Sequence, residues 1–554
     1  MKTTSRLIVS FMLIMSMLIN VNAQNTLSKV EWQEDLRHLQ TIIHKDYPIL
    51  FKKTTAKEFD TAVEQLYNEI PSLDTHEIPV AFARIVSSFL YGHTQIPFST
   101  VAKNGVLPVN LYHFNDGIFI EGVQKEHQST LGAKVLKVGV KPIEEALTLI
   151  RPVVPAENDN YFKGYGLRFL TVPDVLHAQR VIPELSDTIT LTLEKDGKVF
   201  EYAFPKIELR ALSRSYLYTI PNETWISSRS MDKTPLYLKH LNDKYYFFEY
   251  LKDSKTLYVR QSSVFNHESE TLKAFYSRLF EFIDSNDVDK LIYDVRLNGG
   301  GNNYNNVHLI KGLMARPNIN KKGHFFYIIG RNTFSACQNL TNEITNYTEA
   351  ILIGEPTAEN VNFLGDARRE VLPNSKISAY LSYAWWQDKP QWENKDWTIP
   401  HIGVDMSFEQ YITNQDPVLD AAMNYTDSGF ILDPMAHLTQ LFMAGKYDQL
   451  KSDAAEISKN KNYRYYNFQD EFSKAGNRLI SSGDSTAQKS GMFILQLVAE
   501  LYPESVSALY SLANAQEINK LNEKAIESYT KMIALDPKGS LVTVAKSRIE
   551  ALKQ

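Results

Sequence analysis

The stretch KLIYDVRLNGGGN, residues 290–302, decides the fold class, because an apolar run ends there in three consecutive glycines. Strand-like and helix-like patterns alternate around it. The strand-like runs are TLYVRQ, KLIYDVR, HFFYIIG and AILIG, and the helix-like runs between them are SETLKAFYSRLFEFI, NNVHLIKGLMA and SACQNLTNEI. Strands and helices that alternate with short connections predict βαβ units and a largely parallel, buried sheet. Such sheets bind ligands at the carboxyl ends of their strands.

The rest of the chain divides by pattern into further parts. A capping box at Ser28 and Glu31 opens a helical region, and short strand-like runs broken by Gly and Asp turns follow that region. We therefore predict a multidomain α/β protein. The expected parts are a signal peptide (1–23), a helical domain (24–100), a small β domain (101–205), an α/β core (206–430) and a C-terminal helical domain (431–554).

The C-terminal part repeats itself. Pro503 and Pro537 lie 34 positions apart, and each closes a helical segment. The unit that ends at Pro537 fits the tetratricopeptide spacing at Leu512, Ala513, Ala525 and Tyr529. Two such units stack poorly alone, so we expect them to pack on the rest of the chain or on a protein partner.

Composition narrows the classes of partner. The 554 residues carry 59 basic and 64 acidic side chains, a net charge of -5, and 44% of them are hydrophobic. This balance offers no basic field that would attract nucleic acid, so we expect peptide, protein or small-molecule partners. Cys337 is the only cysteine, which excludes an intramolecular disulfide.

The N-terminus has the pattern of an export signal. Lys2 and Arg6 precede a mostly apolar run from Leu7 to Val21, and Ala23 completes a small-residue cleavage signal. The run is 15 residues long, shorter than the roughly 20 that a spanning helix needs. We predict a periplasmic or secreted protein that does not span the membrane after cleavage; an uncleaved anchor is the alternative. No cysteine near Ala23 could carry a lipid.

Ser335 and the glycine run have structural and chemical interpretations. Ser335 begins a predicted helix, so it could serve as an N-cap worth about 1 kcal/mol, or as a nucleophile beside the N–H of Ala336. The glycines 299–301 could form a plain turn, or expose backbone N–H groups for an oxyanion. His93, in YGHTQI, is by itself more often a structural residue than a base.

Other chemistries lack their motifs. H-E-x-x-H, paired C-x-x-C, G-x-G-x-x-G, G-x-S-x-G and the Walker loop are all absent, so we expect no metal and no cofactor. Ser230 with Lys233, and Ser458 with Lys461, match S-x-x-K, but K-T-G is missing.

Four segments in order resemble the C-terminal-processing (tail-specific) serine peptidases and their tricorn-core and retinoid-binding relatives. They are Gly92-His93-Thr94, the stretch Asp294 to Gly301, Thr333-Phe334-Ser335-Ala336 and Ile353-Gly354-Glu355-Pro356-Thr357. The resemblance covers roughly residues 28–425. It implies a crotonase-like βαβ core and a PDZ-like domain over residues 101–205. It also implies Ser335 as nucleophile and the N–H groups of Gly300 and Ala336 as oxyanion hole.

One departure from the peptidase pattern concerns the base. The family's G-E-K-T-x-G-K-G stretch reads GEPTAENV here, with Pro356 and Asn360 in place of the lysines. The tricorn-like branch uses a histidine from the helical domain, and His93 matches that position. An imidazole needs little pKa tuning to accept a proton at neutral pH. The acid that orients His93 is expected to be Asp405, with Asp366 and Glu370 as rivals.

The segment WWQDKPQWENKDW, residues 385–397, holds four of the six tryptophans. It reads as an aromatic plug or surface hairpin, or as a wall or lid that faces the substrate.

Three functions remain open from the sequence. The first is an exported serine peptidase that hydrolyses peptides or protein C-terminal tails. The second is an inactive peptide- or apolar-ligand-binding protein on the same scaffold, and the third is an adaptor built on the C-terminal repeats. The distance between His93 and Ser335 separates the first two.

Overall fold

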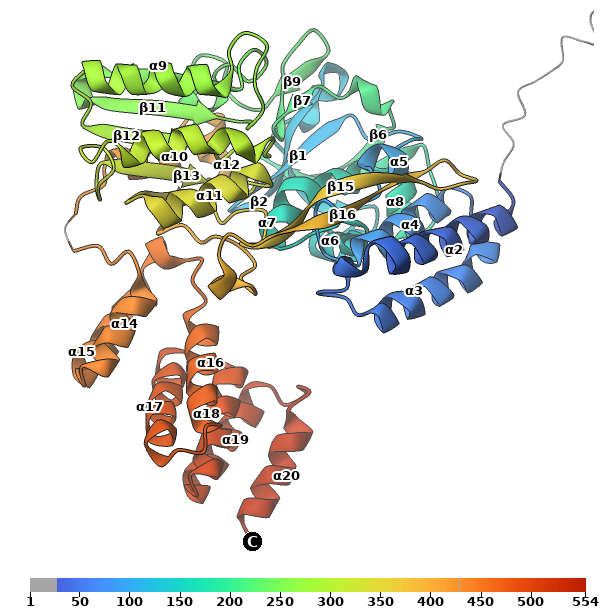
Figure 1. Cartoon of the computed structure of the whole chain (residues 1–554). Coiled ribbons are helices and arrows are strands. Elements are labelled where there is room, and N and C mark those ends of the chain that lie inside the picture. The colour runs from blue at the N-terminus through green and yellow to red at the C-terminus, as the bar shows by residue number, and fades with distance from the viewer. Residues whose placement is uncertain (1–26, 428) are drawn as a thin grey trace, which may run out of the picture.

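A computed structural model describes residues 27–427 and 429–554, and its architecture is mixed α/β (Figure 1). The predicted signal peptide, residues 1–23, lies outside the described residues. No helix in the described ranges is both long enough and apolar enough to cross a bilayer.

A six-stranded sheet forms the centre of the α/β part. Its order is β10-β11-β12-β13-β14-β17; β10 pairs antiparallel with β11, and the other neighbours pair parallel. The strands are β10 (Tyr246–Leu251), β11 (Thr256–Gln261), β12 (Lys290–Asp294), β13 (Phe325–Ile329), β14 (Ile351–Gly354) and β17 (Ile402–Gly403). The alternating pattern of the sequence is confirmed, because β11 to β14 are the four strands that it predicted.

Helices cover both faces of this sheet. The connecting helices share one hydrophobic cluster with the strands; they are α9 (Leu272–Ser285), α10 (Asn306–Met314) and α11 (Ala336–Tyr347). On the other face, α13 (Pro417–Met423) packs on a second cluster that includes Tyr258, Ile292 and Phe326. Strands buried on both faces explain why their sequences are continuous apolar runs rather than alternating ones.

The sequence did not reveal a long hairpin, which crosses from the core to the N-terminal helices in Figure 1. Its strands are β15 (Phe363–Val371) and β16 (Ser378–Trp386). Near its tip, the backbone N–H groups of Asn374 and Ser375 donate to the buried carboxylate of Asp35, at 2.8 and 2.7 Å. The polar, charged β15 explains why the hairpin carries little hydrophobic signal.

The predicted helical and β regions share one hydrophobic core. The helices are α2 (Lys29–Asp46), α3 (Ala56–Glu69) and α4 (Glu77–Ser87), and the Ser28–Glu31 capping box is present at the start of α2. The main strands are β1 (Val109–Phe114), β2 (Gly117–Gln124), β3 (Lys134–Val138), β5 (Thr188–Lys195) and β6 (Lys198–Pro205). A single cluster runs from Trp32 to Phe204 and includes hairpin residues such as Leu381. The two regions therefore pack on each other, and the domain bounds at residues 100 and 205 stay predictions.

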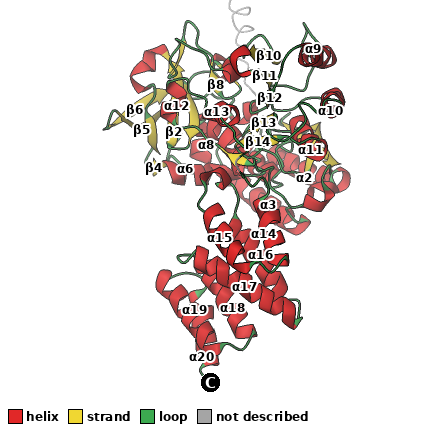
Figure 2. Cartoon of the chain, turned by 90° about the vertical axis from the view of Figure 1, so that its left-hand side faces the viewer, coloured by secondary structure: helices red, strands yellow, loops and turns green. Residues whose placement is uncertain are grey.

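The C-terminal helices form a separate group on one side of the molecule (Figure 2). They are α14 (Pro434–Met443), α15 (Tyr447–Ile457), α16 (Phe468–Ile480), α17 (Ser485–Leu501), α18 (Val506–Ile518), α19 (Asn522–Leu535) and α20 (Val542–Leu552). A Cβ on Gly491 would lie 2.7 Å from the carbonyl oxygen of Gly476, so α16 and α17 meet backbone to backbone there. Ala513, Ala525 and Tyr529 are buried.

Candidate active site

Ser335 lies at the junction between the β13 loop and α11, in a backbone conformation that serines rarely adopt. Its φ is 57° and its ψ is -131°, and its side chain forms no capping hydrogen bond to the helix. Instead its Oγ lies 2.9 Å from Nε2 of His93. Unusual backbone angles that the surroundings enforce are typical of functional positions. The side chain therefore pairs with an imidazole, not with the helix that it precedes.

His93 reaches Ser335 from the loop that follows α4, 242 positions earlier in the chain. Its ring is stacked between Phe334, with ring centroids 4.5 Å apart, and Phe363, at 6.0 Å. Gly92 permits this approach, since a Cβ there would lie 2.5 Å from Tyr161 and 2.8 Å from Phe334. The imidazole is thus held in one plane with Nε2 toward the serine.

Glu359 faces the other nitrogen of that ring. Its Oε1 lies 3.1 Å from Nδ1 of His93, and its Oε2 accepts a hydrogen bond from the backbone N–H of Ser335. Its side chain is completely buried. One carboxylate therefore touches both partners of the Ser335–His93 pair, and it favours the tautomer whose proton is on Nδ1 and whose Nε2 can accept the serine proton.

The expected acid, Asp405, lies elsewhere. Its carboxylate is 2.6 Å from Nη1 of Arg464 and 3.0 Å from Nδ2 of Asn115. The two other candidate acids also have partners away from His93. Asp366 accepts a hydrogen bond from Trp386 at 3.1 Å, and Glu370 accepts one from the hydroxyl of Tyr47. The structure corrects this assignment because Asp405 follows β17 at the sheet edge, where Arg464 of the C-terminal part pairs with it.

A second buried carboxylate, Glu157, lies behind the first. It accepts hydrogen bonds from the N–H groups of Gly92, at 2.8 Å, and Asn360, at 3.1 Å. These two residues adjoin His93 and Glu359 in the chain. Glu157 therefore connects the loop of His93 to the loop of Glu359 through hydrogen bonds.

Burial sets the protonation of this cluster. Desolvation, with the neighbouring charge of Glu359 second, raises the pKa of Glu157 to about 7. Burial also raises the pKa of Glu359 well above its usual range, and it lowers the pKa of His93. Ligand atoms of the three side chains lie within 4.8 Å of one another, so the two carboxylates cannot both ionise freely. His93, with its pKa lowered by burial, is neutral at pH 7, so its ring can accept a proton.

The same three side chains could be considered as ligands for a cation, but most of their carboxylate oxygens already accept hydrogen bonds. Three of the four carboxylate oxygens accept backbone N–H groups, and the fourth faces Nδ1 of His93. Nε2 of His93 is bonded to Ser335. Such a donor set suits a hydrogen-bonded acid–base cluster better than a metal site.

The glycine loop approaches the serine closely. At Gly300, φ is 101° and an added Cβ would lie 2.5 Å from Cβ of Ser335 and 3.0 Å from the backbone nitrogen of Ala336. Ala336 is the first residue of α11, so its N–H has no acceptor within the helix. The N–H of Gly300 differs from expectation, because it donates to Oδ1 of Asn298 at 2.9 Å. That bond must open before Gly300 can receive an oxyanion.

Sequence reasoning missed both glutamates. Glu359 lies within GEPTAENV, the stretch in which a lysine was sought, so a search for any ionisable residue there would have found it. Glu157 is in a loop with no recognisable motif. Cys337, expected to be a core thiol, is completely buried, and burial raises its pKa.

The tryptophan segment has a mainly structural setting. Trp385 and Trp386 end β16, and Nζ of Lys52 lies 4.2 Å above the ring of Trp385. Trp392 is 43% exposed beside Lys389. These contacts fit the hairpin interpretation; among the described residues, the rings that stack on His93 are those of Phe334 and Phe363, not those of these tryptophans.

No protein-family model and no curated protein sequence matches the chain. Among solved structures, mature CPAF complexed with lactacystin is similar at 11% identity over 69% of this chain and 95% of that chain, with a TM-score of 0.45. The photosystem II D1 C-terminal processing protease gives 11% identity, 68% and 93% coverage and a TM-score of 0.30. A protein described as a putative S41 protease from Bacteroides fragilis is 12% identical over 61% of this chain and 82% of that chain, with a TM-score of 0.23. Scores this low carry no argument about function, which rests on the site itself.

Proposed function

We propose that this protein is an exported serine peptidase that hydrolyses peptides or protein C-terminal tails. The observation that carries the proposal is the 2.9 Å separation between Ser335 Oγ and His93 Nε2. The resemblance of the four sequence segments to tail-specific peptidases, and to their crotonase-like core and PDZ-like domain, supports the choice of a peptide substrate.

Each site residue has a role in this mechanism. Ser335 Oγ attacks the carbonyl carbon while His93 Nε2 takes its proton, and the resulting imidazolium is stabilised by Glu359. The N–H of Ala336 and the positive end of the α11 dipole stabilise the oxyanion, with Gly300 as second donor once Asn298 releases it. His93 then returns the proton to the leaving amine, and water hydrolyses the acyl-enzyme by the same route.

The alternative is a non-catalytic binding protein on the same scaffold. The absence of the family's lysines from the stretch GEPTAENV suggested this alternative. It would gain support if Ser335 and His93 lay far apart. Their short distance and the buried Glu359 favour catalysis, because a binding protein has no need to desolvate an ionisable cluster.

A fluorophosphonate probe tests the proposal directly. The wild-type protein should be labelled on Ser335, while Ser335→Ala should not be labelled and His93→Ala should be labelled far more slowly. Ser230→Ala is the matched control, since Ser230 lies in a chance S-x-x-K match and should leave labelling unchanged. Absence of wild-type labelling together with absence of turnover across a broad peptide library would overturn the assignment.

A further inference from the structure

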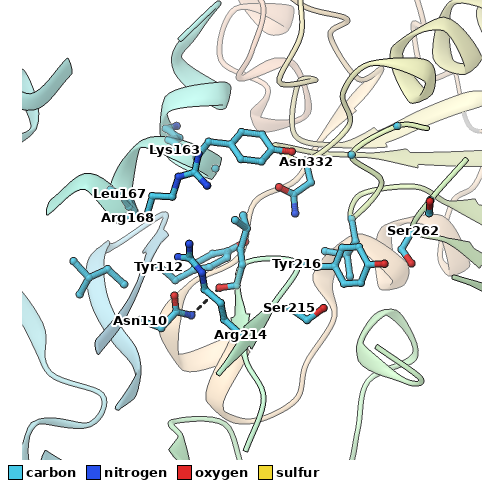
Figure 3. A pocket seen from close by; sticks show the side chains of 18 of the residues that line it. Asn110, Tyr112, Lys163, Leu167, Arg168, Arg214, Ser215, Tyr216, Ser262 and Asn332 are labelled. Carbon is cyan, nitrogen blue, oxygen red and sulfur yellow. Dashed lines mark hydrogen bonds between the residues drawn. The ribbon is translucent and has the colours of Figure 1, made fainter. Parts of the chain in front are cut away.

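A pocket of about 440 Å³ opens beside the glycine loop, between the β1–β6 sheet and the core. We call it the arginine pocket after Arg168 and Arg214, whose guanidinium groups approach it from different elements in Figure 3. Arg168 belongs to a short helix (Leu167–Thr171), and Arg214 opens the strand β7 (Arg214–Ser215). Lys163 also lines the pocket, and no acidic side chain does.

The two arginines have no anionic partner. Neither forms an ion pair or a side-chain hydrogen bond with another residue in the ranges that the structure covers, and Nε of Arg168 is a buried donor without an acceptor. The Arg168 guanidinium lies over the rings of Phe98, at 4.5 Å, and Phe169, at 5.5 Å. Partly buried cations are normally paired with an acidic side chain, and among the described residues these two guanidinium groups have none.

The nearby carboxylates of Glu355 and Glu121 do not neutralise these two arginines, because each already has other partners. Glu355 accepts hydrogen bonds from Nε and Nη2 of Arg331. Glu121 accepts from Asn110 at 2.8 Å and from the hydroxyl of Tyr411. The pKa of Arg214 falls to about 10, first because of burial and second because of the charge of Arg168. Two like charges that face one cavity destabilise each other until an anion enters.

The pocket adjoins the nucleophile. Its wall includes Gly299, Gly300 and Gly301, and the Cβ position of Gly300 is 2.5 Å from Cβ of Ser335. Asn332, three residues before Ser335, lines the same space with its amide (Figure 3). A substrate whose carbonyl lies at Ser335 therefore has part of its chain next to this pocket.

We propose that the arginine pocket binds a carboxylate of the peptide substrate and so selects peptides that are anionic beside the scissile bond. Guanidinium groups bind carboxylates through paired hydrogen bonds, and Arg168 and Arg214 supply such donors at a site without a competing acid. The carboxylate is that of an Asp or Glu side chain or that of the peptide C-terminus. This inference deepens the proposed function and rests on it for the position of the scissile bond.

Binding to the catalytically silent Ser335→Ala protein tests the pocket without requiring turnover. The probes are two matched hexapeptide libraries, one with Glu and one with Gln at the scanned position, each with a free or an amidated C-terminus. We expect the anionic member of a pair to bind on the order of tenfold to a hundredfold more tightly. A Glu effect that persists in amidated peptides identifies a side-chain carboxylate; an effect of amidation alone identifies the terminus.

Variants assign the preference to these residues. Arg214→Gln and Arg168→Gln should bring the ratio of the affinities for Glu and Gln peptides toward one. Arg214→Glu should favour Lys-containing peptides. Arg210→Gln is the matched control, because Arg210 is 87% exposed and does not line the pocket. Arg168 also packs on Phe98, so Arg214→Gln keeps the test decisive if Arg168→Gln fails to fold in a thermal denaturation measurement.

Fluorophosphonate labelling separates the two proposals. If wild type and Arg214→Gln are both labelled but neither discriminates Glu from Gln, the pocket inference is overturned and the serine peptidase stands. If no protein is labelled but Ser335→Ala still prefers anionic peptides in an Arg214-dependent way, the pocket inference is supported and the peptidase assignment fails.

Discussion

At the scale of single residues, Glu359 lies beside His93, in the position that the sequence analysis assigned to Asp405. It contacts His93 Nδ1 through one oxygen and the backbone N–H of Ser335 through the other. The carboxylate therefore contacts both the proposed base and the backbone of the proposed nucleophile. A substitution at this position should affect catalysis more than stability, since the side chain lies in a cluster that is itself costly to bury.

Glu359→Gln should lower kcat by on the order of 100- to 10,000-fold, because a neutral amide does not stabilise the imidazolium and permits the wrong tautomer. Steady-state kinetics on a cleaved peptide measures this effect. Glu349→Gln, an exposed residue ten positions earlier, is the control and should be silent. Equal rates for Glu359→Gln and wild type would exclude Glu359 as the orienting acid.

The Glu157–Glu359 pair should give the activity an acid limb near neutral pH. As pH rises the pair loses its shared proton, and the orienting carboxylate becomes charged. Glu157→Gln removes one negative charge, which lowers the pKa of both Glu359 and His93, so the acid limb of the kcat profile should move to lower pH. A pH–rate profile that is identical in the two proteins contradicts this coupling.

Glu157 should also make stability depend on pH. Its folded-state pKa, about 7, lies above the ordinary value of 4.5, so the native state binds the proton more tightly than the unfolded state does. Its contribution is fully present below pH 4.5 and is lost as pH rises through 7, by about 2–3 kcal/mol. Denaturant melts at pH 5 and 8 should show this difference in wild type and a smaller one in Glu157→Gln.

At the scale of elements, the site is assembled where loops from separate regions meet. The β12 loop supplies the glycines, the β13 loop supplies Ser335, the loop after β14 supplies Glu359 and the loop after α4 supplies His93. The hairpin holds the loop of His93 in place, because Thr94 and Ser382 exchange hydrogen bonds of 3.0 and 3.2 Å. Loops carry the chemistry, and the buried strands hold their starting points.

Gly300→Ala should abolish activity while the protein still folds, because the new methyl group would overlap Cβ of Ser335 and crowd Ala336. Gly197→Ala is the matched control: it also replaces a glycine of positive φ, 71°, but nothing lies within 4 Å of the new Cβ. The control should be destabilised by about 1–2 kcal/mol and should keep full activity. Circular dichroism melts and peptide hydrolysis measure both; an active Gly300→Ala protein would contradict the close approach.

At the scale of the whole molecule, the C-terminal helices contact the α/β part beside β17 and through ion pairs. Arg464 pairs with Asp405 at 2.6 Å, and Lys395 pairs with Glu471 at 2.6 Å. Neither the catalytic cluster nor the arginine pocket includes a residue beyond 430. We therefore expect these helices to be accessory to the proposed chemistry.

Deletion of residues 431–554 should leave fluorophosphonate labelling of Ser335 and peptide hydrolysis within about threefold of wild type, because rim ion pairs contribute little to stability. Loss of hydrolysis with retained secondary structure would instead support the adaptor interpretation, in which the repeats organise function. The Arg464→Ala variant separates loss of this contact from loss of the whole helical part.

The strands β11 to β14 and the positions of Ser335 and Gly300 could be predicted from the sequence, because apolar runs and their endings are local properties of the chain. The pairing of His93 with Ser335 was expected only from a family resemblance. The glutamates, the hairpin and the shared N-terminal core could not be predicted, because none is marked by a periodic pattern.

The sequence by itself determined the alternating α/β core and the glycine and serine loops that end its strands, since burial of both sheet faces requires those runs. Only the tertiary structure decided which acid lies beside His93 and which arginines have no acidic partner. Carboxylates and arginines are common along the chain, and their chemistry depends on what lies within a few ångströms after folding. Glu359 and Asp405 differ in role because one is enclosed with an imidazole and the other is paired with Arg464.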